Sequence, residues 1–390
     1  MSFDYAALDR QVDAVQDRIR KLALDIHAHP ELRFEEHQAA KWIAETVAAA
    51  GVPVETGVGG LATALRARIG TGQGPKVAIL AEYDALPEIG HACGHNLIAA
   101  GAVGAFLALA GVRDRLQGTV ELIGTPAEEG GGGKILLLQA GVFEGVDAAI
   151  MFHPFDRDLL AHYTLASVWI DMVFRGTPSH AALAPWDGKS ALTACMDTFR
   201  LIDSQRVRFR DGVRVHGYIK NGGQAVNIIP ELAEAEFSVR ALDGDELERV
   251  AAIVERCAKA AAMASEVEVE LRRRPGYRDM RNNLSLVRRF GEHLQAFGRT
   301  PREQDPSLGS GSTDMGDVSH VVPAIHPWIQ ICDEGETTCH QHAFAECAKS
   351  ERGLSTMLVA AKVMARTAVD VLHDAGLREA AWQEFRARRR

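Results

Sequence analysis

The chain has 390 residues, which is enough for one large or two ordinary domains with a sizeable core. Apolar residues make up 47% and charged residues 24% of the chain, the composition of an ordinary globular protein. The formal net charge of −9 argues against a general affinity for the phosphates of nucleic acids.

Targeting and membrane signals are weak in this sequence. The segment from Met1 to Arg20 is charged and lacks the apolar core of a secretory signal. The longest apolar run, Leu97–Val112, is shorter than the roughly 20 residues needed to span a bilayer, so we expect a buried helix there. Six irregularly spaced cysteines do not form a disulfide scaffold. We therefore expect a cytoplasmic protein with no membrane association and mostly buried free thiols.

The first 155 residues alternate helical patterns with short continuous apolar runs. Such runs are typical of parallel strands that are covered on both faces of a sheet. The pattern predicts an α/β fold. The predicted strands are Val77–Leu80, Thr119–Ile123 and Ala148–Phe152, and the predicted helices are Asn96–Leu109 and Lys134–Ala140.

The pattern changes from about Ala166 to Asp279. Alternation of apolar and polar residues predicts strands, and these strands are separated by two helical stretches. The resulting order β-α-β-β-α-β is that of a ferredoxin-like unit inserted into a larger, discontinuous α/β domain. The predicted domains are therefore 1–165 with 280–390, and 166–279. The inserted elements are strands Ser167–Arg175, Val213–Lys220, Ala233–Arg240 and Glu266–Arg272, and helices Lys189–Ser204 and Asp245–Met263.

After Asp279 the α/β pattern resumes. We expect a helix near Ser285–Phe297, a strand near Ala324–Ile331 and a helix from Ala343 onward. Ligands of open α/β sheets gather at the carboxyl ends of the strands, and four predicted strands here lead to residues that can bind a metal. These residues are Glu82, Asp84, His91, Cys93 and His95; Glu128 and Glu129; His153; and Cys339, His340 and His342.

Each of these signals has an ordinary structural alternative when taken alone. Cys93 could be a buried thiol in a turn, and the pair Glu128–Glu129 could be a solvated helix start that the helix dipole favours. His153 could be a structural histidine. The spacing of His340 and His342 prevents both from lying on one helix face, so we expect His342 to be a bystander. The convergence of the four groups at strand ends favours a metal centre.

Two glycine-rich stretches are further candidate sites. Gly130–Gly133 resembles a phosphate cradle, but it lacks the spacing and the Ser or Thr of the nucleotide-binding loop. We expect these glycines to allow a tight turn beside Glu129 and to open a helix. The segment from Gly309 to Asp314 is most simply a flexible loop.

Several segments resemble the co-catalytic metallohydrolases of the aminoacylase and carboxypeptidase type. The closest branch resembles p-aminobenzoyl-glutamate hydrolase and aminoacylase-like dipeptidases. The likeness covers nearly the whole chain. The segments are AEYDALPEIGHACGHN, GTPAEEGGGGK, GSGSTDMGDVSHVVPAIHP, HQHAFAEC, HPELRFEEH, GTPSHAA and VNIIPELAEAEFSVRA.

The resemblance implies a discontinuous α/β/α catalytic domain that binds two divalent metal ions, zinc, manganese or cobalt, and an inserted ferredoxin-like domain for lid closure and homodimerisation. Cys93 would bridge the metals, His95 and His153 would complete one site, and Glu129 and His340 the other. Asp84 would orient a ligand histidine. Glu82 stands where many relatives carry a ligand histidine, and His95 takes over that role.

The implied reaction is hydrolysis of an amide bond in a small N-acyl amino acid or dipeptide-like substrate. Glu128 would take a proton from a metal-activated water and pass it to the leaving amine. By analogy, His180 would stabilise the oxyanion and could do so in a partner subunit's site, and Asn227 and Arg240 would hold the substrate carboxylate. For Arg240, a solvent-facing position on a strand is an equal alternative.

Other functions remain open at this stage. The same site could release ammonia from an aromatic amine, or the fold could serve a non-catalytic ligand-binding protein. The complete set of metal-binding residue types argues against the second of these alternatives. A nucleotide-binding oxidoreductase is the weakest alternative, because no G-x-G-x-x-G motif opens a helix after an early strand.

Overall fold

A computed structural model describes residues 3–305 and 307–388 of the chain. The chain divides into two compact units. The first unit comprises Met1–Tyr163, Met280–Gly309 and Thr313–Arg390, and the second comprises Thr164–Asp279 and Ser310–Ser312.

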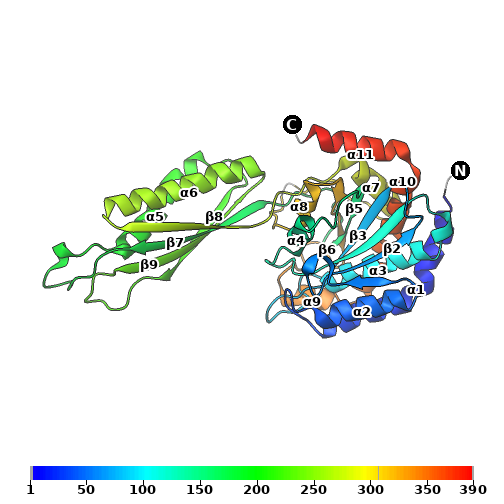
Figure 1. The fold of residues 1–390 in the computed structure, drawn as a ribbon, viewed down its shortest axis with the longest axis horizontal. Helices are drawn as coiled ribbons and strands as arrows, with labels where there is room; N and C mark the ends of the chain where they lie inside the picture. The colour runs from blue at the N-terminus through cyan, green and yellow to red at the C-terminus, as the bar shows by residue number, and fades with distance from the viewer. Residues whose placement is uncertain (1–2, 306, 389–390) are drawn as a thin grey trace. The chain divides into compact units, whose positions relative to one another are not determined.

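The first unit contains a six-stranded sheet with the strand order β1-β2-β4-β3-β5-β11. Figure 1 shows three of these strands, β2, β3 and β5, among the helices of this unit. Strands β3, β4, β5 and β11 are parallel, as their continuous apolar sequences predict, and both faces of this part are buried. Strands β1 and β2 were not predicted and pair antiparallel at one edge. The strands are β1 (Val54–Thr56), β2 (Leu65–Gly70), β3 (Lys76–Glu82), β4 (Thr119–Thr125), β5 (Ala148–Ile150) and β11 (Ala324–Ile325).

Helices cover both faces of this sheet, and side chains of β3 alternate between two apolar clusters. Val77 and Ile79 belong to the cluster shared with α1, α3 and α10, whereas Ala78 and Leu80 belong to the cluster shared with α4 and α8. This alternation follows from the two-residue period of a strand. The helices are α1 (Tyr5–Ala28), α2 (His37–Ala48), α3 (His95–Ala110), α4 (Gly133–Gln139), α7 (Leu284–Gln295), α8 (Met315–Ser319), α9 (His342–Cys347), α10 (Glu351–His373) and α11 (Ala375–Ala387).

Helix α3 accounts for the longest apolar run of the sequence. Its residues from His95 to Leu109 are buried all round, because α1, α10 and the sheet surround it. None of the helices in the described part of the chain is long and apolar enough to cross a membrane. The prediction of a buried helix is therefore confirmed.

The single strand predicted at Ala324–Ile331 is wrong in detail. The segment contains two short strands. The first, β11, pairs with β5. The second, β12 (Trp328–Gln330), pairs with β6 (His153–Phe155) in a separate two-stranded sheet. Pro327 lies at the break, where its missing N–H interrupts the hydrogen-bond ladder. The predicted strand Ala148–Phe152 likewise ends at Ile150, and the chain continues into β6.

The second unit is a four-stranded antiparallel sheet with the order β10-β7-β9-β8 and the helices α5 and α6. Every second residue of β7 lies in the apolar core that this sheet forms with both helices, as the alternating sequence predicts. These residues are Val168, Ile170, Met172 and Phe174. The chain order β-α-β-β-α-β is that of a ferredoxin-like fold. The elements are β7 (Ala166–Arg175), α5 (Ala191–Gln205), β8 (Arg214–Asn221), β9 (Leu232–Ala241), α6 (Gly244–Ala264) and β10 (Glu268–Pro275).

Candidate metal and catalytic site

Five of the predicted metal ligands lie together in the first unit. Their donor atoms form two groups in which all atoms lie within 4.8 Å of one another. One group contains Cys93, His95 and His153, and the other contains Cys93, Glu129 and His340. The Cys93 thiol belongs to both groups, which is the arrangement required of a bridging ligand.

Cys93 and His95 are held at the start of α3. Gly94 has φ 78°, and a Cβ atom there would lie 2.5 Å from Pro154, so only glycine fits between these two ligands. The resulting turn places Cys93 just before the helix and His95 in its first turn. Both side chains are buried, with exposed fractions of 8% and 1%.

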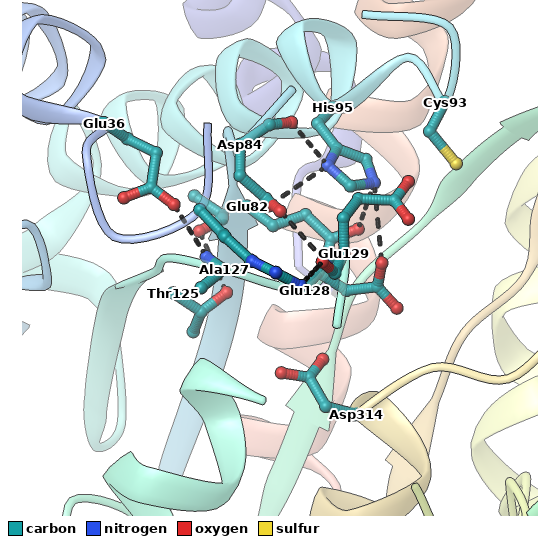
Figure 2. Close-up of polar contacts among 12 residues, drawn as sticks. Glu36, Glu82, Asp84, Cys93, His95, Thr125, Ala127, Glu128, Glu129 and Asp314 are labelled. Carbon is teal, nitrogen blue, oxygen red and sulfur yellow. Dashed lines mark hydrogen bonds and ion pairs between the residues drawn. The ribbon is translucent and has the colours of Figure 1, made fainter. Parts of the chain in front are cut away.

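Asp84, which follows β3, contacts two neighbouring ligands. The Nδ1 atom of His95 lies 2.8 Å from the Asp84 backbone oxygen and 3.3 Å from its carboxylate (Figure 2). The other Asp84 carboxylate oxygen accepts a hydrogen bond of 2.9 Å from the backbone N–H of Glu129. Because Nδ1 of His95 faces these oxygens, its Nε2 atom is directed to the metal-binding group.

The two adjacent glutamates diverge because the backbone turns on both sides of them. Ala127 has φ 60° and Gly130 has φ 83°. The buried carboxylate of Glu36 accepts hydrogen bonds from the N–H of Ala127 at 2.8 Å and from the hydroxyl of Thr63 at 2.9 Å, which holds this left-handed turn. Glu129 can thus join the metal group while Glu128 lies beside it, in a third group with His95 and Glu129.

The glycine run after Glu129 opens α4, as expected. A Cβ atom on Gly133 would lie 1.8 Å from the backbone oxygen of Pro126, so the helix start packs directly against the strand end. Gly132 has φ 68°, a conformation that glycine adopts without strain. The run is therefore a tight structural turn.

His153 and His340 complete the two groups from other segments. The Nδ1 atom of His153 lies 2.7 Å from the backbone oxygen of Pro154, and its Nε2 atom lies 3.5 Å from the Cys93 sulfur. His340 follows β12 by a loop, and its backbone N–H donates to the Ala92 oxygen at 2.8 Å. This bond brings the His340 ring to 3.2 Å from Glu129. His342 lies at the exposed start of α9 and belongs to neither group.

The electrostatic environment of Glu128 suits a proton acceptor. Burial raises its pKa well above the usual range, and the negative charges of Glu129, Glu82 and Asp314 raise it further. Burial lowers the pKa of His153 to about 4, which leaves this imidazole neutral and able to bind a metal. The site therefore combines a basic carboxylate with neutral nitrogen donors.

The donor set fits divalent metal ions. Each group contains one thiol sulfur together with imidazole and, in the second group, carboxylate donors, a mixture that binds transition metals. Ligands bonded to one ion at about 2.0–2.3 Å lie about 3.5 Å apart in tetrahedral geometry, which agrees with the 3.5 Å between Cys93 and His153. The Nδ1 atoms of His95 and His153 face backbone oxygens, so both Nε2 atoms face the site.

One buried ion cluster beside the site was not predicted from the sequence. The ammonium group of Lys134 lies 2.6 Å from Glu82 and 2.7 Å from Asp314, and all three side chains are completely or almost completely buried. The other oxygen of Glu82 lies 3.4 Å from Nε2 of His95. Glu82 is thus a partner of Lys134, and the segment Gly309–Asp314, expected to be a plain loop, supplies the second carboxylate.

We predict that Lys134→Met destabilises the protein strongly. Removing a buried cation leaves two buried carboxylates without their partner, which costs about 3–5 kcal/mol in comparable buried pairs. The free energy of unfolding, measured by chemical denaturation, should fall by this amount. Lys76→Met is a matched control, because Lys76 is more exposed and lies 3.8 Å from its carboxylate partner. Equal losses in the two variants would contradict this role.

A second unpredicted residue is His326. Its ring packs edge-on against His153 at 5.5 Å between centroids, and its exposed fraction is 3%. Burial lowers its pKa to about 3, so it is a neutral neighbour of His153, one of the candidate metal ligands. The only sequence signal was a polar residue within the apolar run Ala324–Ile331.

The remaining predicted residues belong to the second unit and do not form one cluster there. His180 and Asn227 lie on neighbouring loops, joined by a 2.9 Å hydrogen bond from Ala181 N–H to the Asn227 oxygen. Arg240 lies near the opposite end of β9, which starts at Leu232, and its guanidinium is 3.5 Å from the Ser312 hydroxyl. A ten-residue strand spans about 33 Å, so one ligand cannot contact all three within this unit.

The chain is similar to several known proteins. Residues 78–370 match the family described as peptidase family M20/M25/M40. The chain belongs to this family. The Xaa-Arg dipeptidase of Mus musculus is 36% identical over 395 residues, covering 97% of this chain and 91% of the relative. A p-aminobenzoyl-glutamate hydrolase chain of Escherichia coli K12 is 29% identical over 458 residues, covering 97% of this chain and 94% of the relative.

A solved structure from Bacillus subtilis, described as a dinuclear metal-binding peptidase of the M20 family, has the same fold. Its TM-score is 0.73 at 24% sequence identity, with 93% of this chain and 99% of that chain covered. The predicted fold, an α/β/α metallopeptidase-like domain with an inserted ferredoxin-like domain, is confirmed. The protein is a metal-dependent amidohydrolase that acts on amide bonds in small substrates.

Proposed function

We propose that the two donor groups bind two divalent metal ions that share the Cys93 thiolate. The observation that carries the proposal is the membership of Cys93 in both groups, with Glu128 beside them. His95 and His153 would hold one ion, and Glu129 and His340 the other. Bound ions would supply a water with its pKa lowered to about 7 and would polarise the amide carbonyl.

In this proposal Glu128 is the general base. Its buried carboxylate has a raised pKa, which allows it to hold the proton of the attacking water and then deliver it to the leaving amine. Asp84 acts as a positioning residue, because it contacts both His95 and the backbone N–H of Glu129. These contacts fix one ligand from each donor group.

We propose that His180 stabilises the oxyanion. Its Nδ1 atom accepts hydrogen bonds from the backbone N–H groups of Ala182 at 3.2 Å and Leu183 at 3.1 Å. With Nδ1 occupied as an acceptor, the ring hydrogen is carried by Nε2 on an exposed side chain, which makes Nε2 the available donor.

His180→Ala should lower turnover by about 100-fold or more, as the loss of an oxyanion donor does in other hydrolases. The metal content, measured by elemental analysis, should not change. His216→Ala is a suitable control, because His216 is also an exposed histidine of the second unit, on β8. Turnover that survives the His180 substitution would show that the donor lies elsewhere.

The positions of His180 and Arg240 favour a homodimer in which they serve different sites. The two residues lie at opposite ends of the second unit. We propose that Arg240, half-buried beside Ser312, helps to hold the carboxylate of the substrate. His180 and Asn227, on neighbouring loops, would reach the site of a partner subunit, where Asn227 would help to hold the substrate carboxylate. In this proposal the inserted unit serves as the lid and as the dimer surface.

The substrate is proposed to be a small N-acyl amino acid or dipeptide. This proposal draws on the relatives, one a dipeptidase and the other a hydrolase of p-aminobenzoyl-glutamate. A panel of dipeptides, N-acyl amino acids and p-aminobenzoyl-glutamate, with and without chelator, tests it. Release of a free amino acid that stops with chelator is the expected result. Release of ammonia in place of an amino acid would favour the alternative reaction, deamination of an aromatic amine.

The metal and the location of the protein are part of the proposal. A shared thiolate favours zinc, while manganese and cobalt are alternatives that cellular availability would decide. All six cysteines are free, which favours a reducing, cytoplasmic environment. Metal analysis of the purified protein and its distribution between cell fractions test these two points.

A further inference from the structure

Two cysteines meet at the proposed metal site. Cys339 directly precedes His340, and the hydrogen bond from the His340 N–H to the Ala92 oxygen at 2.8 Å lays this segment beside Cys93. The pKa of the Cys93 thiol is raised, first by the neighbouring Cys339 thiol and second by burial, which agrees with two side chains that lie close together. In the proposed mechanism Cys339 has no role, so its position against the shared ligand is not explained by the reaction.

The two thiols differ in their access to solvent. Cys93 is buried, with an exposed fraction of 8%, whereas Cys339 is half-buried at the edge of the apolar cluster around Trp328. Cys339 lies in the loop between β12 and α9, next to His340 with φ 68°. A reagent from solvent therefore reaches Cys339 before Cys93. The Cys93 thiol lies close enough to react with the modified Cys339 sulfur.

We propose that Cys93 and Cys339 form a redox modification site, at which a low-molecular-weight disulfide such as oxidised glutathione produces a Cys93–Cys339 disulfide in the metal-free protein. The Cys339 sulfur attacks one glutathione sulfur, the glutathione S–S bond breaks, and one reduced glutathione leaves with a proton. The Cys93 sulfur then attacks the Cys339 sulfur and releases the second reduced glutathione with the Cys93 proton. Two protein thiols are oxidised and one glutathione disulfide is reduced.

The consequence rests on the proposed function. Because Cys93 belongs to both donor groups, one disulfide removes a ligand from both metal positions at once. Metal and disulfide compete for the same sulfur, so a metal-loaded chain is protected and an oxidised chain cannot reload. Reduction restores both sites, which makes the modification a reversible block on metal uptake.

The test uses the full chain after removal of metal by a chelator. The protein is incubated with oxidised or reduced glutathione, free thiols are alkylated, and peptides are mapped by mass spectrometry. Zinc uptake is measured in parallel by equilibrium dialysis. We expect a crosslinked peptide pair containing Cys93 and Cys339, zinc affinity reduced more than about 100-fold, and recovery of both thiols and zinc uptake with a reductant.

Two variants test whether Cys339 is the disulfide partner of Cys93. Cys339→Ser should show no crosslink to Cys93 and should keep its zinc uptake after the same oxidant. Cys347→Ser is the matched control, because Cys347 is also a free, half-buried cysteine, at the end of α9, and the cysteine that influences its pKa is Cys332. This variant should still form the Cys93–Cys339 crosslink.

Two outcomes would overturn the proposal. One is the recovery of both Cys93 and Cys339 as alkylated thiols after oxidation of the wild-type chain, including the case in which only Cys332 and Cys347 are joined. The other is a crosslinked chain that binds zinc as well as the reduced chain. A reduced wild-type chain that binds no zinc would instead contradict the proposed function, and the peptide map would still report the disulfide separately.

Discussion

Glu128→Gln is expected to lower turnover by about 100- to 10,000-fold while the metal content stays unchanged. Glutamine has nearly the same size and can still occupy the buried position beside His95 and Glu129, but it cannot take a proton from the attacking water. Glu128 belongs to neither of the two donor groups that contain Cys93. Its substitution therefore leaves all the proposed ligands of both metal ions in place. Turnover of an N-acyl amino acid and metal per chain, measured on the same preparation, give both quantities.

The control for this variant is Glu121→Gln. Glu121 is also a buried glutamate close to Glu128 in sequence, on β4, but it pairs with Arg68 at 2.7 Å and belongs to no donor group of the described residues. This variant should lose some stability and keep its turnover per folded molecule. If Glu128→Gln retains activity, the general base is another residue.

Cys93→Ser is expected to abolish binding of both metal ions. A serine hydroxyl is a poor replacement for a thiolate that is shared by two ions, and Cys93 is the common member of both donor groups. Loss of an orienting residue outside the ligand set already costs about 10- to 100-fold in metal affinity, so loss of the shared ligand should cost more than about 100-fold. Competition with a chromogenic chelator measures the affinity, and turnover should disappear in parallel.

Cys195→Ser is the control for the loss of metal affinity in Cys93→Ser. Cys195 is completely buried in α5 of the second unit and belongs to none of the metal-binding groups found among residues 3–305 and 307–388. Its substitution should leave metal affinity unchanged. A Cys93→Ser protein that binds one ion with normal affinity would contradict the bridging role and limit Cys93 to one site.

The sequence predicted the elements whose patterns are long and regular. The strand β7 and the helix α3 were found because alternation and continuous burial leave direct traces in their sequences. The strand predicted at Ala324–Ile331 was wrong because Pro327 interrupts pairing, which an apolar run does not reveal. The edge strands β1 and β2 were missed because they are short or partly exposed.

The candidate site shows the same limit at the level of side chains. The spacing around Cys93 and Glu129 pointed to chemistry, since thiol, imidazole and carboxylate groups follow strand ends. Lys134 and Glu36 gave no such signal, because each acts through partners that are far away in the sequence. Lys134 meets Asp314, and Glu36 meets Ala127, only after folding. Long-range contacts of this kind are not encoded in local spacing.

The most direct test of the central claim is a metal titration of the chelator-treated protein, with hydrolysis of a responsive amide substrate measured at each step. We expect no activity without metal and a rise that reaches its plateau at two ions per chain, with a free amino acid as product. Full activity without metal, or a chain that binds no metal and remains inactive, would contradict the assignment of Cys93 and its neighbours as the catalytic metal site.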